Sequence, residues 1–137
     1  MPVSAVLAWL RLFRVFQRID RAQTVHLRSW NLNVAQFDVL ARVGTHKGIT
    51  QQELADSLLV TKGNISLLLN RMEEMGLLKR YQERRSNTLF LTAKGQELYD
   101  CVVPAHEELI ACLMSGVSPS ELRQLQHLLR KLEYTLR

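Results

Sequence analysis

The chain contains little cysteine and no long hydrophobic run. Its two cysteines, Cys101 and Cys112, are too few for a disulfide framework. No apolar segment approaches the roughly 18 residues needed to cross a bilayer. Arg11 and Arg14 interrupt the apolar N-terminal stretch, and no small-residue cleavage site follows it, so it does not resemble a signal peptide. These absences argue against a disulfide-built or membrane protein and lead us to expect a cytoplasmic one.

The chain also lacks the sets of residues on which enzymes depend. It has no glycine-rich phosphate loop and no nucleophile motif. Glu107 and Glu108 follow His106, but adjacent side chains on a helix point apart and do not form an acid–base pair. We therefore expect no enzymatic activity, no cofactor and no metal site.

The bulk composition suits a small globular protein. A length of 137 residues with 47% hydrophobic content is enough for one domain, or for one compact fold with a dimerisation extension. The net charge of +5 allows an anionic partner. Most of this excess lies in residues 1–30, whereas residues 50–92 are nearly balanced. Anion contacts in the second region must therefore depend on where its basic side chains lie.

Residues 50–76 have the pattern of two short helices joined by a tight turn. Thr50 and Glu53 have the spacing of a capping box for the first helix. Thr61 caps the second helix, and Gly76 supplies the left-handed residue that ends it. One face of the second helix is apolar and the opposite face is rich in hydrogen-bond donors. This pattern indicates a helix-turn-helix whose second helix can enter the DNA major groove.

A hairpin is predicted directly after these helices. Residues 77–82 and 87–91 favour strands, and the tip between them is the basic sequence Glu83-Arg84-Arg85-Ser86. The helix-turn-helix and the hairpin together predict a winged helix-turn-helix. The expected fold class is therefore mostly α with a small β-wing.

Long amphipathic helices are predicted on both sides of this unit, over 4–28, 93–114 and 118–136. Their apolar stripes exceed what a small winged core needs for its own burial, which predicts contact with each other and with a second subunit. The chain then divides into an N-terminal dimerisation helix at 1–32, a winged helix-turn-helix DNA-binding domain at 33–92, and C-terminal dimerisation helices at 93–137.

Several motifs resemble those of the multiple antibiotic resistance regulator (MarR) family of winged-helix transcription factors. The resembling segments are ELADSL, TKGNISLLLNRMEEMGLLKR with its closing Gly-Leu-x-x-Arg, the acidic-x-Arg wing signature at Glu83-Arg84-Arg85, and Leu91-Thr92-Ala93-Lys94-Gly95. Glu83 stands where the family usually has Asp, and the wing is short. The resemblance covers nearly the whole chain by helix order and length.

The resemblance implies a set of DNA contacts. The recognition helix would contact the major groove, and the wing would reach the minor groove or the phosphates. Glu83 would orient Arg85 through an ion pair, and Arg71 could instead pair with Glu74. Phosphates would bind at helix N-termini. The implied DNA-binding residues are Thr50, Gln51, Thr61, Lys62, Asn64, Ser66, Asn70, Arg71, Arg84 and Arg85.

The function that follows is sequence-specific binding of double-stranded DNA by a transcriptional regulator, most simply a homodimeric repressor. Dimer symmetry predicts an inverted-repeat operator with half-sites about one helical turn apart. Members of the family often bind aromatic acids, so a small aromatic or anionic ligand could modulate DNA binding. The residues expected to line its pocket are Arg14, Arg18, His26, Trp30 and Phe37.

The two cysteines leave alternatives open. They lie about 16 Å apart along one helix, from a rise of about 1.5 Å per residue, so they cannot bridge within it. The simplest interpretation is two small buried apolar residues. A redox switch, or metal binding that includes His106, would make the chain a redox- or metal-responsive regulator. Otherwise we expect His46, His106 and His127 on the surface. A winged-helix module that binds protein is the remaining alternative.

Overall fold

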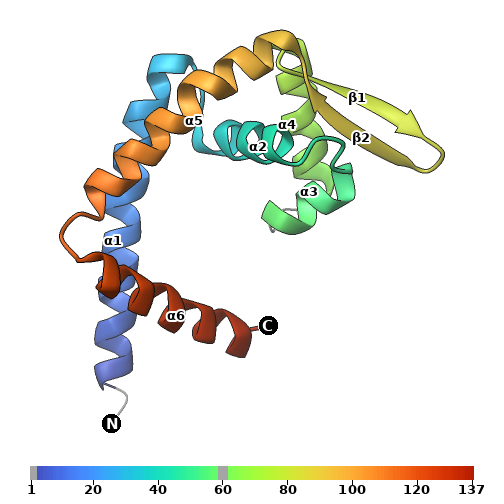
Figure 1. Ribbon diagram of the computed structural model, residues 1–137. Coiled ribbons are helices and arrows are strands. Elements are labelled where there is room, and N and C mark those ends of the chain that lie inside the picture. Colours follow the sequence, from blue (N-terminus) through green and yellow to red (C-terminus); the bar gives the residue numbers. More distant parts are fainter. Residues whose placement is uncertain (1–2, 59–61) are drawn as a thin grey trace.

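The computed structural model describes the fold of residues 3–58 and 62–137 (Figure 1). Its element order matches the expected one. The elements are α1 (Val3–Leu27), the single 3-10 turn η1 (Arg28–Trp30), α2 (Val34–Thr45), α3 (Gln51–Leu58), α4 (Lys62–Glu74), β1 (Leu78–Glu83), β2 (Ser86–Leu91), α5 (Ala93–Leu113) and α6 (Pro119–Thr135). The prediction of a mostly helical fold with a small β-wing is confirmed. Within the described ranges, no helix has the length and apolarity needed to span a membrane.

The helix starts form where local side chains satisfy the free amide groups. Asn33 with Gln36, and Ser118 with Glu121, form reciprocal capping boxes at α2 and α6. Thr92 accepts a hydrogen bond from the amide of Gly95 and caps α5. The cap expected at Thr61 lies outside the described residues.

The hydrophobic core is built by α2, α3, α4, the hairpin and the first half of α5. We call this unit the head. The helices contribute successive turns of one face, and the strands contribute residues that point toward the helices. The fully buried side chains include Leu40 and Val43 from α2, Leu54 from α3, Leu69 and Met72 from α4, Leu78 and Leu89 from the hairpin, and Val102 from α5.

The hairpin is held to the head at its base. Strands β1 and β2 pair antiparallel from Leu78 opposite Leu91 to the tip. A short third segment joins them: the amide of Gly48 donates to the carbonyl of Leu89 at 3.1 Å, and the amide of Leu89 donates to Ile49 at 2.9 Å. The segment at Gly48 and Ile49 therefore pairs with the wing. It fixes the direction in which the wing extends from the helices.

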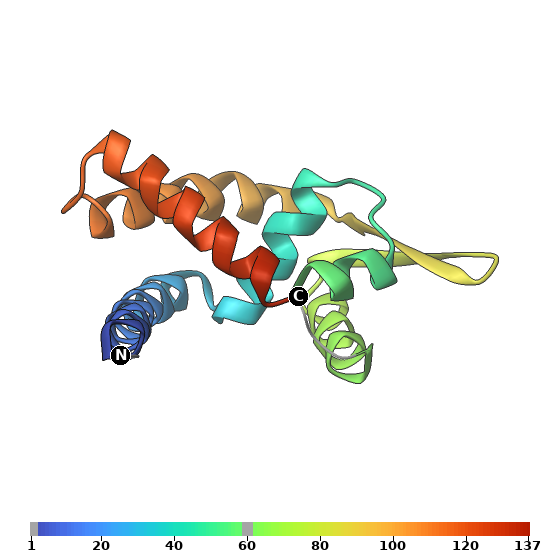
Figure 2. The same ribbon diagram turned by 90° about the horizontal axis from the view of Figure 1, so that it is seen from below.

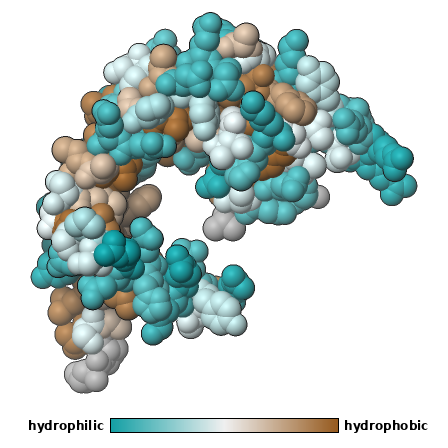
Figure 3. All heavy atoms as spheres, in the orientation of Figure 1, coloured by the Kyte–Doolittle hydropathy of each residue, from teal (hydrophilic) through white to brown (hydrophobic). Residues whose placement is uncertain are grey.

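The terminal helices α1 and α6 contribute little to the core. Only Leu27 of α1 is buried, and α6 contributes no buried residue. In Figure 1 the N-terminal part of α1 and the whole of α6 lie below the head and apart from it, and in Figure 2, seen from below, α6 runs back toward the side of the molecule that carries the head. Their apolar side chains are exposed, and Trp9 on α1 is 58% exposed. Figure 3 shows this hydrophobic surface along the α1 end of the molecule.

Candidate nucleic-acid interface

One face of α4 is free of the core and carries polar side chains. Ile65, Leu69 and Met72 are buried on the inner face. Asn64 and Asn70 lie on the exposed side, in agreement with their predicted position. Leu67 lies on the same side and is 68% exposed, which is unusual for leucine unless a partner covers it. The side chain of Lys62 lies outside what the structure describes.

Gln51, at the start of α3, connects the recognition helix to the wing. Its side-chain nitrogen donates to the hydroxyl of Ser66 on α4 at 3.4 Å. Its side-chain oxygen accepts a hydrogen bond from Asn87 on β2 at 3.4 Å. The resemblance implied a phosphate contact for Gln51 and a DNA contact from the recognition helix for Ser66, but the structure brings these two side chains together. The pair therefore helps to set the angle between α4 and the wing.

Thr50 is engaged in the capping box expected for α3. Its hydroxyl accepts a hydrogen bond from the amide of Glu53 at 3.0 Å, and its amide donates to the Glu53 carboxylate at 3.0 Å. Hydrogen bonding of the Glu53 carboxylate with the Thr50 backbone amide, and then with the Thr50 side chain, lowers the pKa of Glu53 below its ordinary value. Two amide groups at this helix start are thus satisfied internally, and a negative charge lies beside them. The amide and the hydroxyl of Thr50 are both engaged in this capping box, so Thr50 is poorly placed to bind a phosphate.

A second connection between α4 and the wing was not anticipated from the sequence. The Nε of Arg80 on β1 donates to the carboxylate of Glu73 on α4 at 2.7 Å, and its Nη2 lies 2.6 Å from the same oxygen. The same Nη2 also donates to the side-chain oxygen of Asn70. The available signal was the arginine of the Gly-Leu-x-x-Arg motif, but no helical or strand periodicity relates it to a residue on the preceding helix.

Arg71 and Glu74 form the expected pair, with Nη1 and Oε2 separated by 3.6 Å. Their side chains are 66% and 69% exposed. Exposed pairs of this kind contribute little to stability and are readily exchanged for other partners. Arg71 therefore keeps access to an anion in front of α4.

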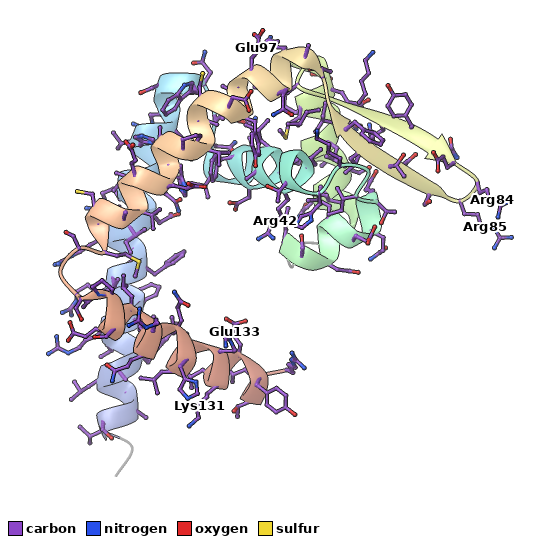
Figure 4. All side chains as sticks on the ribbon, viewed as in Figure 1. Arg42, Arg84, Arg85, Glu97, Lys131 and Glu133 are labelled. Atoms are coloured by element: carbon purple, nitrogen blue, oxygen red, sulfur yellow. The ribbon has the colours of Figure 1, made fainter. Side chains whose placement is uncertain are left out.

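The wing ends in two arginines. Arg84 and Arg85 form the turn between the paired residues Glu83 and Ser86, and both side chains lie at the far end of the hairpin (Figure 4). The prediction of an ion pair between Glu83 and Arg85 is wrong. Among the described residues, the ion pairs are Arg71 with Glu74 and Arg80 with Glu73. The backbone carbonyl of Glu83 accepts a hydrogen bond from the Ser86 hydroxyl, and Arg85 lies at the tip of the hairpin.

The five residues expected to line one ligand pocket do not come together. Arg14 and Arg18 are exposed on α1, and Phe37 is buried in the core. The rings of His26 and Trp30 lie 5.0 Å apart, edge to face. Of the five, Trp30 alone lines a pocket of about 480 Å³ between η1, the end of α4 and the start of α5. Its other lining residues are Asn31, Met75, Leu77, Lys94, Glu97, Leu98 and Cys101.

The environments of His106 and the two cysteines differ from the expected ones. Cys101 and Cys112 are exposed on α5, not buried. His106 is half-buried: its Nε2 lies 3.0 Å from the side-chain oxygen of Gln23, and its ring packs 4.1 Å from that of Phe37. Burial, and then the nearby His26, lowers the pKa of His106. Among the described residues, no group of three or more His, Cys, Asp or Glu could hold a metal ion.

A winged helix-turn-helix with a polar recognition face and an arginine-tipped wing defines the class of winged-helix DNA-binding proteins. Comparison with known proteins agrees with this class. A model of the MarR family matches residues 30–86. An HTH-type transcriptional regulator of Bacillus cereus is 37% identical over 98 residues, which cover 72% of this chain and 67% of that protein. YkoM of Bacillus subtilis, another HTH-type regulator, is 33% identical over 129 residues, covering 89% and 84% of the two chains.

The fold also superimposes on MepR of Staphylococcus aureus. The MepR–DNA complex gives a TM-score of 0.85 with 26% identity, covering 94% of this chain and 98% of that one. MepR in its DNA-binding conformation gives 0.83, and a further MepR crystal structure gives 0.65. This chain belongs to the MarR family of transcription regulators. Family membership also confirms the prediction that it is not an enzyme.

Proposed function

We propose that this protein is a homodimeric repressor that binds an inverted-repeat operator in double-stranded DNA. The observation that carries the proposal is the geometry of the head, in which the polar face of α4 and the arginine tip of the wing are held together. Gln51 and Arg80 connect the two through side-chain hydrogen bonds. The greater similarity to MepR in its DNA-binding conformation than to the other MepR structure supports a chain already shaped for DNA.

Dimerisation is supported by the terminal helices. The exposed apolar residues of α1 include Trp9, Phe13 and Phe16, and those of α6 include Leu128 and Leu132. Exposed faces of this size are unusual on a monomer and typical of a subunit interface. We accordingly assign residues 1–32 and 93–137 to dimerisation and residues 33–92 to DNA binding, in a cytoplasmic protein.

Repression follows from where such a dimer would sit. Two heads joined by their terminal helices would cover two half-sites about one helical turn apart, which excludes other proteins from the same DNA face. A small aromatic ligand fits the pocket beside Trp30, because Met75, Leu77 and Leu98 offer apolar contact there. The pocket lies between the end of α4 and α5, so its occupation would act on the position of the recognition helix.

The exposure of Cys101 at this pocket favours one second candidate, a thiol-responsive regulator. Oxidation requires access to the sulfur, and both cysteines have it. The test is DNA affinity with and without thiol reductant, for the natural chain and for Cys101→Ser and Cys112→Ser. Equal affinities in all arms would contradict thiol control and leave the repressor proposal intact.

The main proposal is tested by selecting binding sites for the purified protein from a random duplex library at moderate salt. We expect enrichment of an inverted repeat, and an affinity that falls steeply as salt rises, because phosphate contacts release counterions. A protein-binding module would enrich no sequence and would show no such salt dependence. The effect on transcription is then measured with a reporter carrying the selected site: lower expression supports a repressor, and higher expression contradicts it.

A further inference from the structure

The side chain of Asn70 is fixed by a partner that determines which of its two ends faces outward. Asn70 lies on the exposed side of α4, one turn beyond Ser66. Its side-chain oxygen accepts a hydrogen bond from Arg80 Nη2. Arg80 is itself held by Glu73 through Nε at 2.7 Å, and its side chain is only 21% exposed. The guanidinium is therefore a fixed group and not a mobile surface cation.

This contact assigns the orientation of the Asn70 amide. A guanidinium has donors and no acceptor, so the group of Asn70 that faces Arg80 must be the oxygen. The amide nitrogen, with its two N–H donors, then points away from Arg80 on the exposed side. A free asparagine presents both a donor and an acceptor, and this pair is what recognises adenine bidentately. Here Arg80 holds the oxygen on its own side by bonding to one of the two lone pairs, so the donor is the end that is turned outward.

We propose that Arg80 turns the donor end of Asn70 outward, so that Asn70 recognises a keto oxygen on a base edge, guanine O6 or thymine O4, and does not make the two-point contact that selects adenine. This inference deepens the proposed DNA-binding function and rests on it. In the major groove, guanine and thymine present keto acceptors, whereas cytosine and adenine present amino donors at the equivalent place. If the Asn70 amide nitrogen faces the amino group of cytosine or adenine, no hydrogen bond forms and two donors face each other.

Glu73 is a positioning residue for Arg80. It neutralises Arg80 and holds it by two short contacts, so the guanidinium stays on the wing side of α4. Asn70 consequently links base recognition to the position of β1. Arg80 is a positioning residue in this arrangement, because it acts on DNA through Asn70 and makes no base contact of its own.

The experiment starts from the operator selected by the natural protein and measures competition by every single-base-pair substitution. Asn70→Ala identifies the position that Asn70 contacts, because preference there should become flat. At that position we expect the natural protein to favour guanine or thymine over cytosine by roughly 3- to 10-fold, the value of one hydrogen bond. Preferences at the other positions are the internal control for folding and docking.

Two further variants test the orientation. In Asn70→Asp, one carboxylate oxygen still faces Arg80 and the other presents an acceptor, so preference at the same position should reverse toward cytosine or adenine. In Arg80→Lys, the ammonium can still pair with Glu73 but lacks the fork that reaches both partners. Asn70 is then released, and adenine should gain at that position.

The outcomes separate this inference from the function on which it rests. Failure of the natural protein to select any site would contradict sequence-specific DNA binding itself. If a site is selected but Asn70→Ala weakens all sequences equally, Asn70 contacts the phosphate backbone and the inference is wrong. An adenine preference in the natural protein at the Asn70 position, or no change of preference in Asn70→Asp, would overturn it as well.

Discussion

The head and the terminal helices bury their apolar residues differently. The head encloses Leu40, Leu54 and Leu69 completely. The terminal helices carry apolar stripes of comparable length, yet Leu128 and Leu132 on α6 are 56% and 52% exposed. The head therefore has a core of its own, whereas the stripes of α1 and α6 require another surface.

This difference separates two tasks within one chain. A recognition helix and a wing must keep a fixed relative position, and a closed core with the Gln51 and Arg80 contacts supplies it. Spacing two such heads on DNA is a property of the assembly, and it depends on how the apolar stripes meet. A change in the terminal helices should thus alter DNA binding without unfolding the head.

A charge introduced into the apolar stripe of α6 should have the largest effect on dimerisation and operator affinity. For Leu132→Glu we expect dissociation of the dimer, because a carboxylate buried in an apolar interface is strongly unfavourable. Loss of the second head should lower operator affinity by about 100-fold or more, since the two half-sites are then bound independently. Analytical ultracentrifugation measures the assembly, and fluorescence anisotropy measures the affinity.

The matched control is Arg130→Glu, which places the same side chain on the opposite face of α6. It should remain dimeric and keep most of its operator affinity. Equal behaviour of Leu132→Glu and Arg130→Glu would mean that the α6 stripe is not an interface.

The second prediction tests the closed packing of the head. A methyl group added at Gly95, on the first turn of α5, would clash with the backbone carbonyl oxygen of Leu77, which cannot move away as a flexible side chain could. We expect Gly95→Ala to lower the free energy of unfolding by about 1–3 kcal/mol or more.

Gly116 lies between α5 and α6 with no atom within 4 Å of an added Cβ. Gly116→Ala should change stability by less than about 0.5 kcal/mol in urea denaturation; equal losses for both variants would contradict the argument.

Most of the fold could be predicted from the sequence because its signals are local. The capping pairs Asn33 with Gln36 and Ser118 with Glu121 mark helix starts within four residues, and Gly76 marks a stop by its positive φ of 76°. Strand alternation and a basic tip mark the hairpin. Each of these signals depends on neighbours in the chain, so no knowledge of the tertiary structure is needed.

The candidate site was predicted less well because its contacts join distant residues. The bond of Gln51 with Asn87 spans 36 positions and that of His106 with Gln23 spans 83, and no periodicity relates such pairs. The sequence therefore identified the DNA-facing elements but treated Gln51, Ser66 and Asn70 as independent contacts. The residues expected around a ligand are likewise separated in the single chain, because whether Arg14 and Trp30 share a cavity depends on the tertiary packing of α1 and not on sequence spacing.

The third prediction concerns strain at the wing tip. Arg84 adopts a φ of +53°, a conformation that favours glycine, whereas Arg85 does not have a positive φ. Arg84→Gly should therefore raise the free energy of unfolding by up to about 1 kcal/mol, and Arg85→Gly should lower it by about 0.5–1 kcal/mol. Both variants lose a guanidinium and should bind DNA more weakly. Unchanged DNA affinity in Arg84→Gly would mean that the strained arginine serves no purpose in binding.

The smallest expected effect is a pH dependence of stability caused by His106, where α1 meets the head. The folded protein lowers the pKa of His106 below its ordinary value of 6.5, through burial and then the charge of His26, while Glu107 opposes the shift. The unfolded chain therefore takes up a proton that the folded chain resists. Stability is fully present above pH 6.5 and falls as the pH is lowered through that value toward the folded pKa.

Urea denaturation followed by circular dichroism between about pH 5 and 7.5 measures this dependence. His106→Gln should flatten the decline in that window, because the group whose pKa differs between the two states has been removed. His127→Gln, which changes an exposed histidine on α6, should keep the decline of the natural chain. If His127→Gln flattens it and His106→Gln does not, the pH sensitivity belongs to the terminal helices and not to the junction with the head.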